Sequence, residues 1–415
     1  MSPSRRTVLA GSGLGLTGLL GGVFARDGWS PGSSPYDWPM SRYDAAGTAH
    51  TTEASGPKAE PTIRWETRGQ TFLGVEGEGP LAPIRVGSAL YTAGRRLRAL
   101  AVDDGTVRFE SDAEYTTPPV RARAEHYETG TIAAVTQRGI VGENAGGGVE
   151  LFGTNYATRR WLSNEFVHRE EQITGFGNPR RPASRPVPWD GTLYTLVPRG
   201  GRVAVVAIDP NDGSVQWQRR PEVPEWGFFA PLSRPVFRND TLYAASTNGT
   251  VIAVAADGST QRWRESLDLQ NTTALTASAT GLLVPHESGV TLLGYDGTVR
   301  WNRTPERSET PEISTAAVTD EISAVVRGQT LYAFDLETGE TLWTAGDCGR
   351  APVIADGVVY ATGTDRLAAF DVGNGDLLFE FEYSDQLRGP LSPPVVGDGR
   401  LYCNSYNQTL ALEGP

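Results

Sequence analysis

The sequence of 415 residues contains very little lysine, cysteine or histidine. Lys58 is the only lysine, and the formal net charge is -12. A basic face of the kind that binds a phosphate backbone is therefore excluded as a main feature, and we expect no nucleic-acid partner. The histidines are isolated from one another, and no pair has the spacing of zinc ligands. They are His50, His126, His168 and His286.

Long apolar runs are also missing beyond the N-terminus. An uncharged stretch rich in glycine and leucine, 7–25, follows Arg5 and Arg6 in a twin-arginine pattern. A membrane span needs about 20 mostly apolar residues, so this stretch is a weak anchor. It predicts an export signal at 1–27, cleaved or retained, and an extracellular or cell-surface protein exported by a Tat-like route. We expect no other membrane insertion.

Arginine supplies almost all the positive charge. An acidic, lysine-poor composition of this kind resembles that of proteins from salt-loving archaea. A GC-rich genome that replaces lysine codons with arginine codons produces the same bias. Both explanations remain open at this point.

Glycine and proline, in contrast, are abundant. The 49 Gly, the 28 Pro and the scattered 10 Trp suit many short strands joined by tight turns. A chain of this length is too long for one ordinary compact core, so it forms either several domains or one large closed repeat. Composition therefore favours an all-β repeat architecture.

A hairpin motif recurs along the chain. The segments 331–343 and 367–379 match position for position, and each carries Asp, Gly and an aromatic residue in register. Asp209, Gly213 and Trp217 repeat the same frame. The motif predicts a strand, a turn that needs positive φ, and a partner strand ending in the aromatic residue. The recurring aspartates are thus assigned to turns and not to catalysis.

A second motif precedes each hairpin. A proline is followed eight residues later by a tyrosine, which predicts a first strand, a turn and a second strand. The pairs are Pro83 and Tyr91, Pro186 and Tyr194, Pro235 and Tyr243, Pro352 and Tyr360, and Pro394 and Tyr402. Together the two motifs make a four-stranded antiparallel unit, which is the size of a propeller blade.

The chain ends predict how such a ring closes. The last unit, 394–412, has three strands, whereas 63–65 is an orphan fourth strand. Pairing the two removes exposed sheet edges. The aromatic residues that end outer strands predict eight blades, with seven as the alternative because 131–161 is irregular. They are Trp65, Phe109, Trp161, Trp217, Trp263, Trp301, Trp343 and Phe379.

The pattern resembles the pyrroloquinoline-quinone-like (PQQ-like) repeat family over about 60–412. The opening 38–44 is similar to that family's lead-in. The resemblance implies that the eight aromatic residues dock neighbouring blades. It predicts an eight-bladed β-propeller at 61–415 behind an extended lead-in at 28–60. It leaves function open, since the family contains enzymes, assembly scaffolds and sensor ectodomains.

Enzymes of that family imply specific chemistry. Quinoprotein dehydrogenases hold the quinone and Ca²⁺ in the ring centre with acidic and amide ligands, a catalytic aspartate and often an adjacent cysteine pair. Cys348 and Cys403 are far apart in sequence, and no suitable trio of ligands aligns. We therefore expect no catalytic residue, no metal and no cofactor, with a PQQ- and Ca-dependent dehydrogenase of alcohols or sugars as the alternative. A disulfide between the two cysteines is left open.

Partner binding is assigned to long insertions. Three of them follow successive outer strands and should emerge on one face, at 110–130, 162–184 and 219–233. Trp226, Phe228 and Phe229 lie in a proline-stiffened loop, and Phe176 adds a weaker patch. Exposed aromatics are common binding anchors, although a loop folded back into the ring is the alternative.

Two arginines occupy equivalent positions in adjacent units. Arg185 and Arg234 each precede the strand-opening proline, so they could receive an anion at the channel mouth or pair with local carboxylates. Overall we expect a monomeric, secreted or cell-surface, non-enzymatic propeller. It would act as a scaffold for envelope or secreted proteins. A carbohydrate-binding propeller is a further alternative.

Overall fold

Short strands make up the regular structure in the computed structural model. It describes residues 30–68, 80–151, 154–164, 183–199, 202–222, 233–305, 312–383 and 389–415. Within these ranges no helix is long and apolar enough to cross a membrane. The predicted export signal at 1–27 lies outside the described residues.

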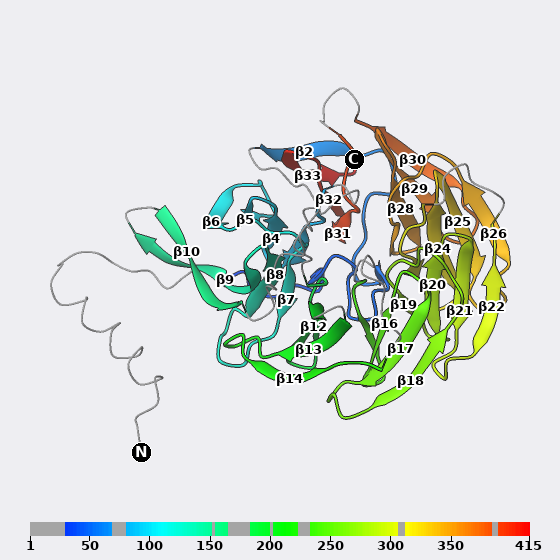
Figure 1. Cartoon of the computed structure of the whole chain (residues 1–415). Coiled ribbons are helices and arrows are strands. Elements are labelled where there is room, and N and C mark those ends of the chain that lie inside the picture. The colour runs from blue at the N-terminus through cyan, green and yellow to red at the C-terminus, as the bar shows by residue number, and fades with distance from the viewer. Residues whose placement is uncertain are drawn as a thin grey trace, which may run out of the picture.

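The strands form eight four-stranded antiparallel blades around a central axis (Figure 1), which confirms the predicted fold. Blade 1 contains β3 (Ile84–Val86), β4 (Ala89–Ala93), β5 (Arg96–Ala101) and β6 (Val107–Asp112). Blade 2 contains β7 (Val120–Ala122), β8 (Thr131–Thr136), β9 (Gly139–Leu151) and β10 (Thr154–Ser163). Blade 3 contains β11 (Val187–Trp189), β12 (Thr192–Arg199), β13 (Arg202–Ile208) and β14 (Val215–Arg219).

The next three blades repeat the arrangement. Blade 4 contains β15 (Val236–Arg238), β16 (Thr241–Ala245), β17 (Thr250–Ala255) and β18 (Gln261–Ser266). Blade 5 contains β19 (Thr276–Ala277), β20 (Leu282–His286), β21 (Gly289–Leu293) and β22 (Val299–Arg303). Blade 6 contains β23 (Ala317–Val318), β24 (Ile322–Arg327), β25 (Thr330–Asp335) and β26 (Thr341–Ala345).

The last two blades also use strands from the N-terminal part of the chain. Blade 7 contains β27 (Val353–Ala355), β28 (Val358–Thr362), β29 (Arg366–Asp371) and β30 (Leu377–Glu382), and β1 (His50–Thr51) adds to it in parallel. Blade 8 contains β31 (Val395–Gly397), β32 (Arg400–Asn404), β33 (Gln408–Glu413) and β2 (Thr62–Arg68).

Blade 8 closes the ring. The N-terminal strand β2 runs antiparallel to the C-terminal strand β33, with Thr62 opposite Glu413 and Arg68 opposite Gln408. In Figure 1 the blue β2 lies against the red β33. The pairing covers an edge that blade 8 would otherwise expose. The predicted closure is confirmed, and the count of eight blades replaces the alternative of seven.

Both sequence motifs correspond to local structure. The motif proline directly precedes an inner strand, and the motif tyrosine pairs with that strand's first residue, as in Val236 opposite Tyr243. In the hairpin turns the glycine has positive φ, which is 71° at Gly339. The carboxylate of Asp335 accepts hydrogen bonds from the backbone nitrogens of Glu337 and Thr338. The aspartate therefore holds the turn.

Blade 2 corrects one prediction. The proposed insertion at 110–130 contains β7, the inner strand of that blade. Val120 of β7 pairs with Ala133, so the β7–β8 connection is longer than in the blades that carry the proline–tyrosine motif. Tyr127 has the motif spacing from Pro119 but lies between the strands, 41% exposed. Because this connection is longer, the proline–tyrosine spacing did not predict β7.

Candidate functional site

The lead-in segment (30–60) runs through the middle of the ring as the dark blue trace in Figure 1. Among the described residues, its backbone makes hydrogen bonds to the inner strand, or to the turn after it, in every blade except blade 3. The bonds join Trp38 with Arg85, Pro39 with Arg121, Ala45 with Phe237, Ala46 with Ala277, Thr48 with Val318, Ala49 with Ile354, and Ser55 with Gly399. In blade 3 the matching position is Pro188, whose nitrogen cannot donate.

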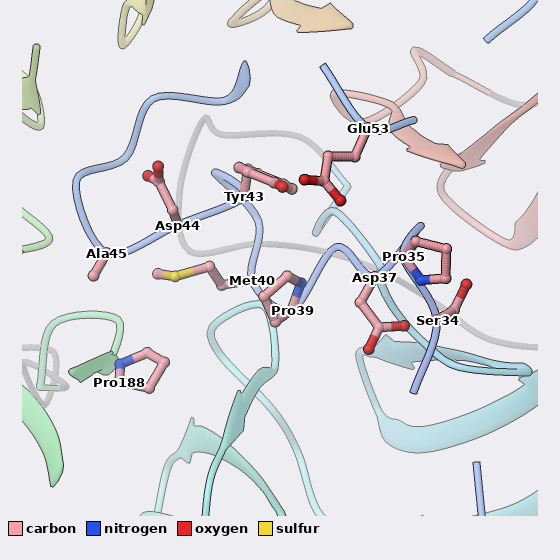
Figure 2. Close-up of a pocket in the computed structure, with 10 residues that line it drawn as sticks. All are labelled: Ser34, Pro35, Asp37, Pro39, Met40, Tyr43, Asp44, Ala45, Glu53 and Pro188. Atoms are coloured by element: carbon pink, nitrogen blue, oxygen red, sulfur yellow. The ribbon is translucent and has the colours of Figure 1, made fainter. Parts of the chain in front are cut away.

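A pocket of about 410 Å³ lies beside this segment. Pro188 lines it from blade 3, and the other lining residues belong to the lead-in segment (Figure 2). Three carboxylates, Asp37, Asp44 and Glu53, lie apart from one another around it. The pocket lies next to blade 3, the blade for which no backbone hydrogen bond to the lead-in segment is found among the described residues.

Two of these carboxylates are engaged within the protein. Asp37 accepts hydrogen bonds from the Gly87 backbone nitrogen at 2.5 Å and from Arg121 Nη1 at 3.1 Å. Asp44 accepts from the backbone nitrogen and the hydroxyl of Thr48, at 2.9 and 2.8 Å. These bonds shape the lead-in segment. In the described ranges no group of three or more His, Cys, Asp or Glu side chains could hold a metal ion.

Three arginines, Arg42, Arg185 and Arg234, form the second feature of the ring centre, the arginine cluster. Arg42 comes from the lead-in segment and is 4% exposed. Its Nη1 and Nη2 donate to the carbonyls of Pro352 and Ala316, at 2.9 and 2.6 Å. Its Nε has no hydrogen-bond partner in the described part of the chain. Both acceptors are neutral carbonyls, so these two hydrogen bonds bring no negative charge to Arg42.

Arg234 is equally buried, at 4% exposed. Neither Nη1 nor Nη2 has a hydrogen-bond partner among the described residues. The guanidinium lies against Gly47 of the lead-in segment, where an added Cβ would come within 1.9 Å of Nη2. Gly47 also has a φ of 75°, which favours glycine. The lead-in segment thus leaves room for this side chain only because residue 47 is glycine.

The three guanidinium groups act on one another electrostatically. Burial and then the positive charges of Arg234 and Arg185 lower the pKa of Arg42 to about 9, while Asp44 opposes this. Burial lowers the pKa of Arg234 to about 10, with Asp44 opposing and Arg185 adding to the effect. Burial lowers the pKa of Arg185 to about 10. All three pKa values exceed 7, so all three side chains are charged at neutral pH.

The sequence indicated two members of this cluster and missed the third. Arg185 and Arg234 lie at matching positions before β11 and β15, as the repeat predicted. Arg42 was missed because it precedes the first blade and belongs to no repeat. Its one sequence signal is its place inside 38–44, the segment that resembles the family lead-in.

The described residues of the ring centre do not fit a quinone held by Ca²⁺. Calcium takes six to eight oxygen ligands, mostly carboxylates and carbonyls. The buried ionisable groups gathered here are mainly guanidinium groups, which repel a cation, and Asp44 is already bonded to Thr48. The lead-in segment also runs through the middle of the ring, which is where the family resemblance implies that a quinone would be held.

Seven of the eight predicted blade-docking residues have a contact with a neighbouring blade, and Phe379 is the exception among the contacts of the described residues. The ring of Trp301 in blade 5 packs on Gly339 in the turn of blade 6, and its Nε1 donates to the Leu336 carbonyl at 3.1 Å. Phe109 packs against Gly147 and Phe379 lies near Tyr360 within blade 7. The other members of the series pack on a turn glycine of the next blade. They are Trp65 on Gly105, Trp161 on Gly213, Trp217 on Gly258, Trp263 on Gly297 and Trp343 on Gly375.

The two cysteines are free thiols, so the disulfide that the sequence left open is not formed. Cys348 is 1% exposed and Cys403 is fully buried. Burial raises the pKa of the Cys348 thiol to about 12, and it also raises that of Cys403. Both thiols are therefore protonated at neutral pH and unreactive.

The predicted partner-binding residues lie outside the described residues. This applies to Trp226, Phe228 and Phe229 and to Phe176. In the part that the structure describes, exposed apolar side chains occur mainly on outermost strands. Val299 of β22, Leu342 of β26 and Leu377 of β30 are 53%, 46% and 53% exposed.

The fold and the filled ring centre define an eight-bladed β-propeller with an internal N-terminal segment. A family model described as outer membrane protein assembly factor BamB matches residues 199–345 and 327–412. These matches overlap and together cover just over half of the chain. The chain therefore belongs to this family of PQQ-like propeller proteins. Comparison with the curated proteins returned no match.

Solved structures with the same fold include two dehydrogenases and a computationally designed protein. The quinohemoprotein alcohol dehydrogenase from Comamonas testosteroni is 12% identical with a TM-score of 0.61, over 91% of this chain and 80% of the dehydrogenase. A europium-containing methanol dehydrogenase is 12% identical with a TM-score of 0.63, over 92% and 98%. The computationally designed Ika8 protein is 13% identical with a TM-score of 0.57, over 83% and 99%. These similarities establish the fold and leave the function to the site.

Proposed function

We propose that this protein is a non-enzymatic scaffold that binds another protein in the cell envelope or outside the cell. The observation that carries the proposal is the lead-in segment, which is hydrogen-bonded to seven of the eight blades and runs through the middle of the ring. In this position it competes with any quinone for the centre. The family description, that of an assembly factor, supports the same reading.

A propeller with a filled centre has two kinds of surface left for a partner. One is the set of loops at the faces, where propellers usually bind. The other is the outer edge, where Val299, Leu342 and Leu377 expose apolar side chains. The aromatic loop that contains Trp226, Phe228 and Phe229 is the first candidate because large aromatic residues dominate binding energies.

Crosslinking on intact cells of the source organism tests the proposal. The wild type is compared with a variant in which Trp226, Phe228 and Phe229 are all replaced by alanine. A matched control replaces Val299, Leu342 and Leu377 by alanine, which removes a similar number of apolar side chains from the outer edge. Captured proteins are identified by mass spectrometry.

We expect specific envelope proteins with the wild type and the control, and at least tenfold less capture with the aromatic variant. Loss in the outer-edge variant alone would keep the scaffold role and move its surface to the blade edges. Absence of any specific partner would contradict the proposal. Stoichiometric, Ca²⁺-dependent binding of pyrroloquinoline quinone in equilibrium dialysis would also contradict it and support the dehydrogenase alternative.

A further inference from the structure

Two members of the arginine cluster, Arg42 and Arg234, have buried nitrogens without a hydrogen-bond partner among the described residues. Asp44 is the acidic group that acts on both Arg42 and Arg234. Both oxygens of Asp44 already accept hydrogen bonds from Thr48. Beyond Asp44, no second acidic group is found against the guanidinium groups of Arg42 and Arg234 in the described part of the structure.

Such an arrangement is costly without a further partner. A guanidinium does not lose its proton at neutral pH, so Arg42 and Arg234 cannot escape the cost of burial by becoming neutral. Burying a charge is strongly unfavourable unless the charge is paired and hydrogen-bonded. Arg234 nevertheless has both terminal nitrogens without a protein partner in the described ranges.

We infer that the ring centre binds a small oxyanion, such as sulfate, phosphate or a free carboxylate, between Arg42, Arg185 and Arg234. The inference does not depend on the scaffold function, because it needs no protein partner. It assigns a role to the buried nitrogens of Arg42 and Arg234 that have no acceptor among the described residues.

The geometry selects the class of ligand. Nη1 and Nη2 of Arg234 form the two-pronged face of a guanidinium, which matches two oxygens of one anion. Nε of Arg42 is a further donor without a partner in the described residues. The pocket beside the lead-in segment does not suit an anion, because Asp37, Asp44 and Glu53 line it. The burial of Arg42 and Arg234 excludes bulky ligands.

Sulfate is a suitable probe because it can be exchanged for chloride at constant ionic strength. A ligand that binds only the folded protein raises the unfolding temperature in a saturable way. We expect a saturable increase for the wild type and for the control variant Arg300→Met, whose side chain is exposed on β22. Arg234→Met should weaken the apparent sulfate affinity at least about tenfold, since it removes charge-assisted hydrogen bonds.

Comparing Arg234→Met with Arg300→Met also separates specific binding from general salt stabilisation, which sulfate produces in any protein. An equal, non-saturable increase in wild type and Arg234→Met would overturn the inference. Because Arg234→Met could fail to fold, crystals of the wild type soaked in selenate supply a second measurement. An anomalous selenium peak between the three guanidinium groups supports the site, and no peak there contradicts it. Soaks with acetate, seen by difference density, distinguish a carboxylate from a tetrahedral oxyanion.

Discussion

At the residue scale, a tryptophan at the end of an outer strand contacts two blades at once. Trp301 belongs to blade 5, yet its indole packs on Gly339 and bonds to Leu336 of blade 6. Gly339 has two structural roles: it adopts positive φ in the turn, and its lack of a side chain leaves space for the indole ring. The same pairing of Trp and Gly recurs around the ring, so blade docking depends on turn chemistry.

Two glycine substitutions separate the backbone role from the packing role. Gly339→Ala places a Cβ 2.7 Å from Trp301, whereas Gly357→Ala meets nothing within 4 Å, and both positions have positive φ. We expect Gly357→Ala to cost about 1 kcal/mol of unfolding free energy from backbone strain alone. Gly339→Ala should cost about 1 to 3 kcal/mol more, because the docked ring must move. Denaturant unfolding of both variants measures the difference, and equal losses would contradict the docking role.

A buried histidine predicts a dependence of stability on pH. His286 is 1% exposed, and burial together with the positive charge of Arg327 lowers its pKa from 6.5 to about 4. The folded state thus keeps His286 neutral, while the unfolded state takes up a proton as the pH falls below 6.5. Its contribution to stability is therefore present above pH 6.5 and is lost as the pH falls toward 4.

The substitution His286→Gln tests this, because glutamine does not titrate and can still bond to Thr291. We expect the unfolding temperature of the variant to fall less steeply between pH 6.5 and pH 4 than that of the wild type. Parallel curves for the two proteins would rule out this histidine as the cause. The carboxylates titrate in both proteins, so the difference between the curves isolates His286.

At the scale of the element, ring closure depends on one short strand. β2 is joined to blade 8 through β33 alone, and its register runs from Thr62 to Arg68. An edge strand outside a closed architecture exchanges its amide hydrogens quickly. A strand that closes a ring cannot leave without opening the whole structure.

Hydrogen exchange therefore tests the closure. We expect the amides of β2 that bond to β33 to exchange as slowly as those of β29 in the middle of blade 7. Amides in the exposed turns provide the fast reference within the same molecule. Exchange in β2 more than about a hundredfold faster than in β33 would show that the strand frays locally and that the ring is closed by other contacts.

At the scale of the whole molecule, the lead-in segment lies along the ring axis and connects the inner strands of the blades. Trp38 and Met40 of this segment are 0% and 1% exposed, and its backbone bonds reach seven blades. Each inner strand takes its register from the second strand of its own blade, whereas the lead-in segment bonds to several blades at once. We therefore assign much of the cooperativity of the fold to this segment.

Removal of residues 1–60 leaves β2 in place and tests that assignment. The truncated protein loses the burial of Trp38 and Met40, worth about 2 to 3 kcal/mol each, and the backbone bonds. We expect its unfolding temperature to fall by more than about 5 °C in scanning calorimetry. Removal of 1–29 alone, which precedes the described segment, is the control. An unchanged unfolding temperature after the longer truncation would contradict the stabilising role of the lead-in segment.

The sequence by itself determined most of the blades and the closure of the ring, and it favoured eight blades over seven, because these features follow from short-range patterns. A turn glycine, a turn aspartate and a strand-ending aromatic lie within about a dozen residues of each other, so the repeat reveals them. The pattern failed at β7, where a longer connection separates Val120 from its partner Ala133. The repeat spacing no longer locates a strand where the connection between two strands has a different length.

Only the tertiary structure decided what fills the ring. Arg42 lies far from Arg185 and Arg234 in sequence, and no repeat relates it to them. All three reach the ring centre because the lead-in segment runs along the axis and the inner strands of the blades surround that axis. The structure also shows that Cys348 and Cys403 are separate buried thiols. Contacts of this kind depend on where distant elements come together, and a sequence pattern with a period of one blade does not encode them.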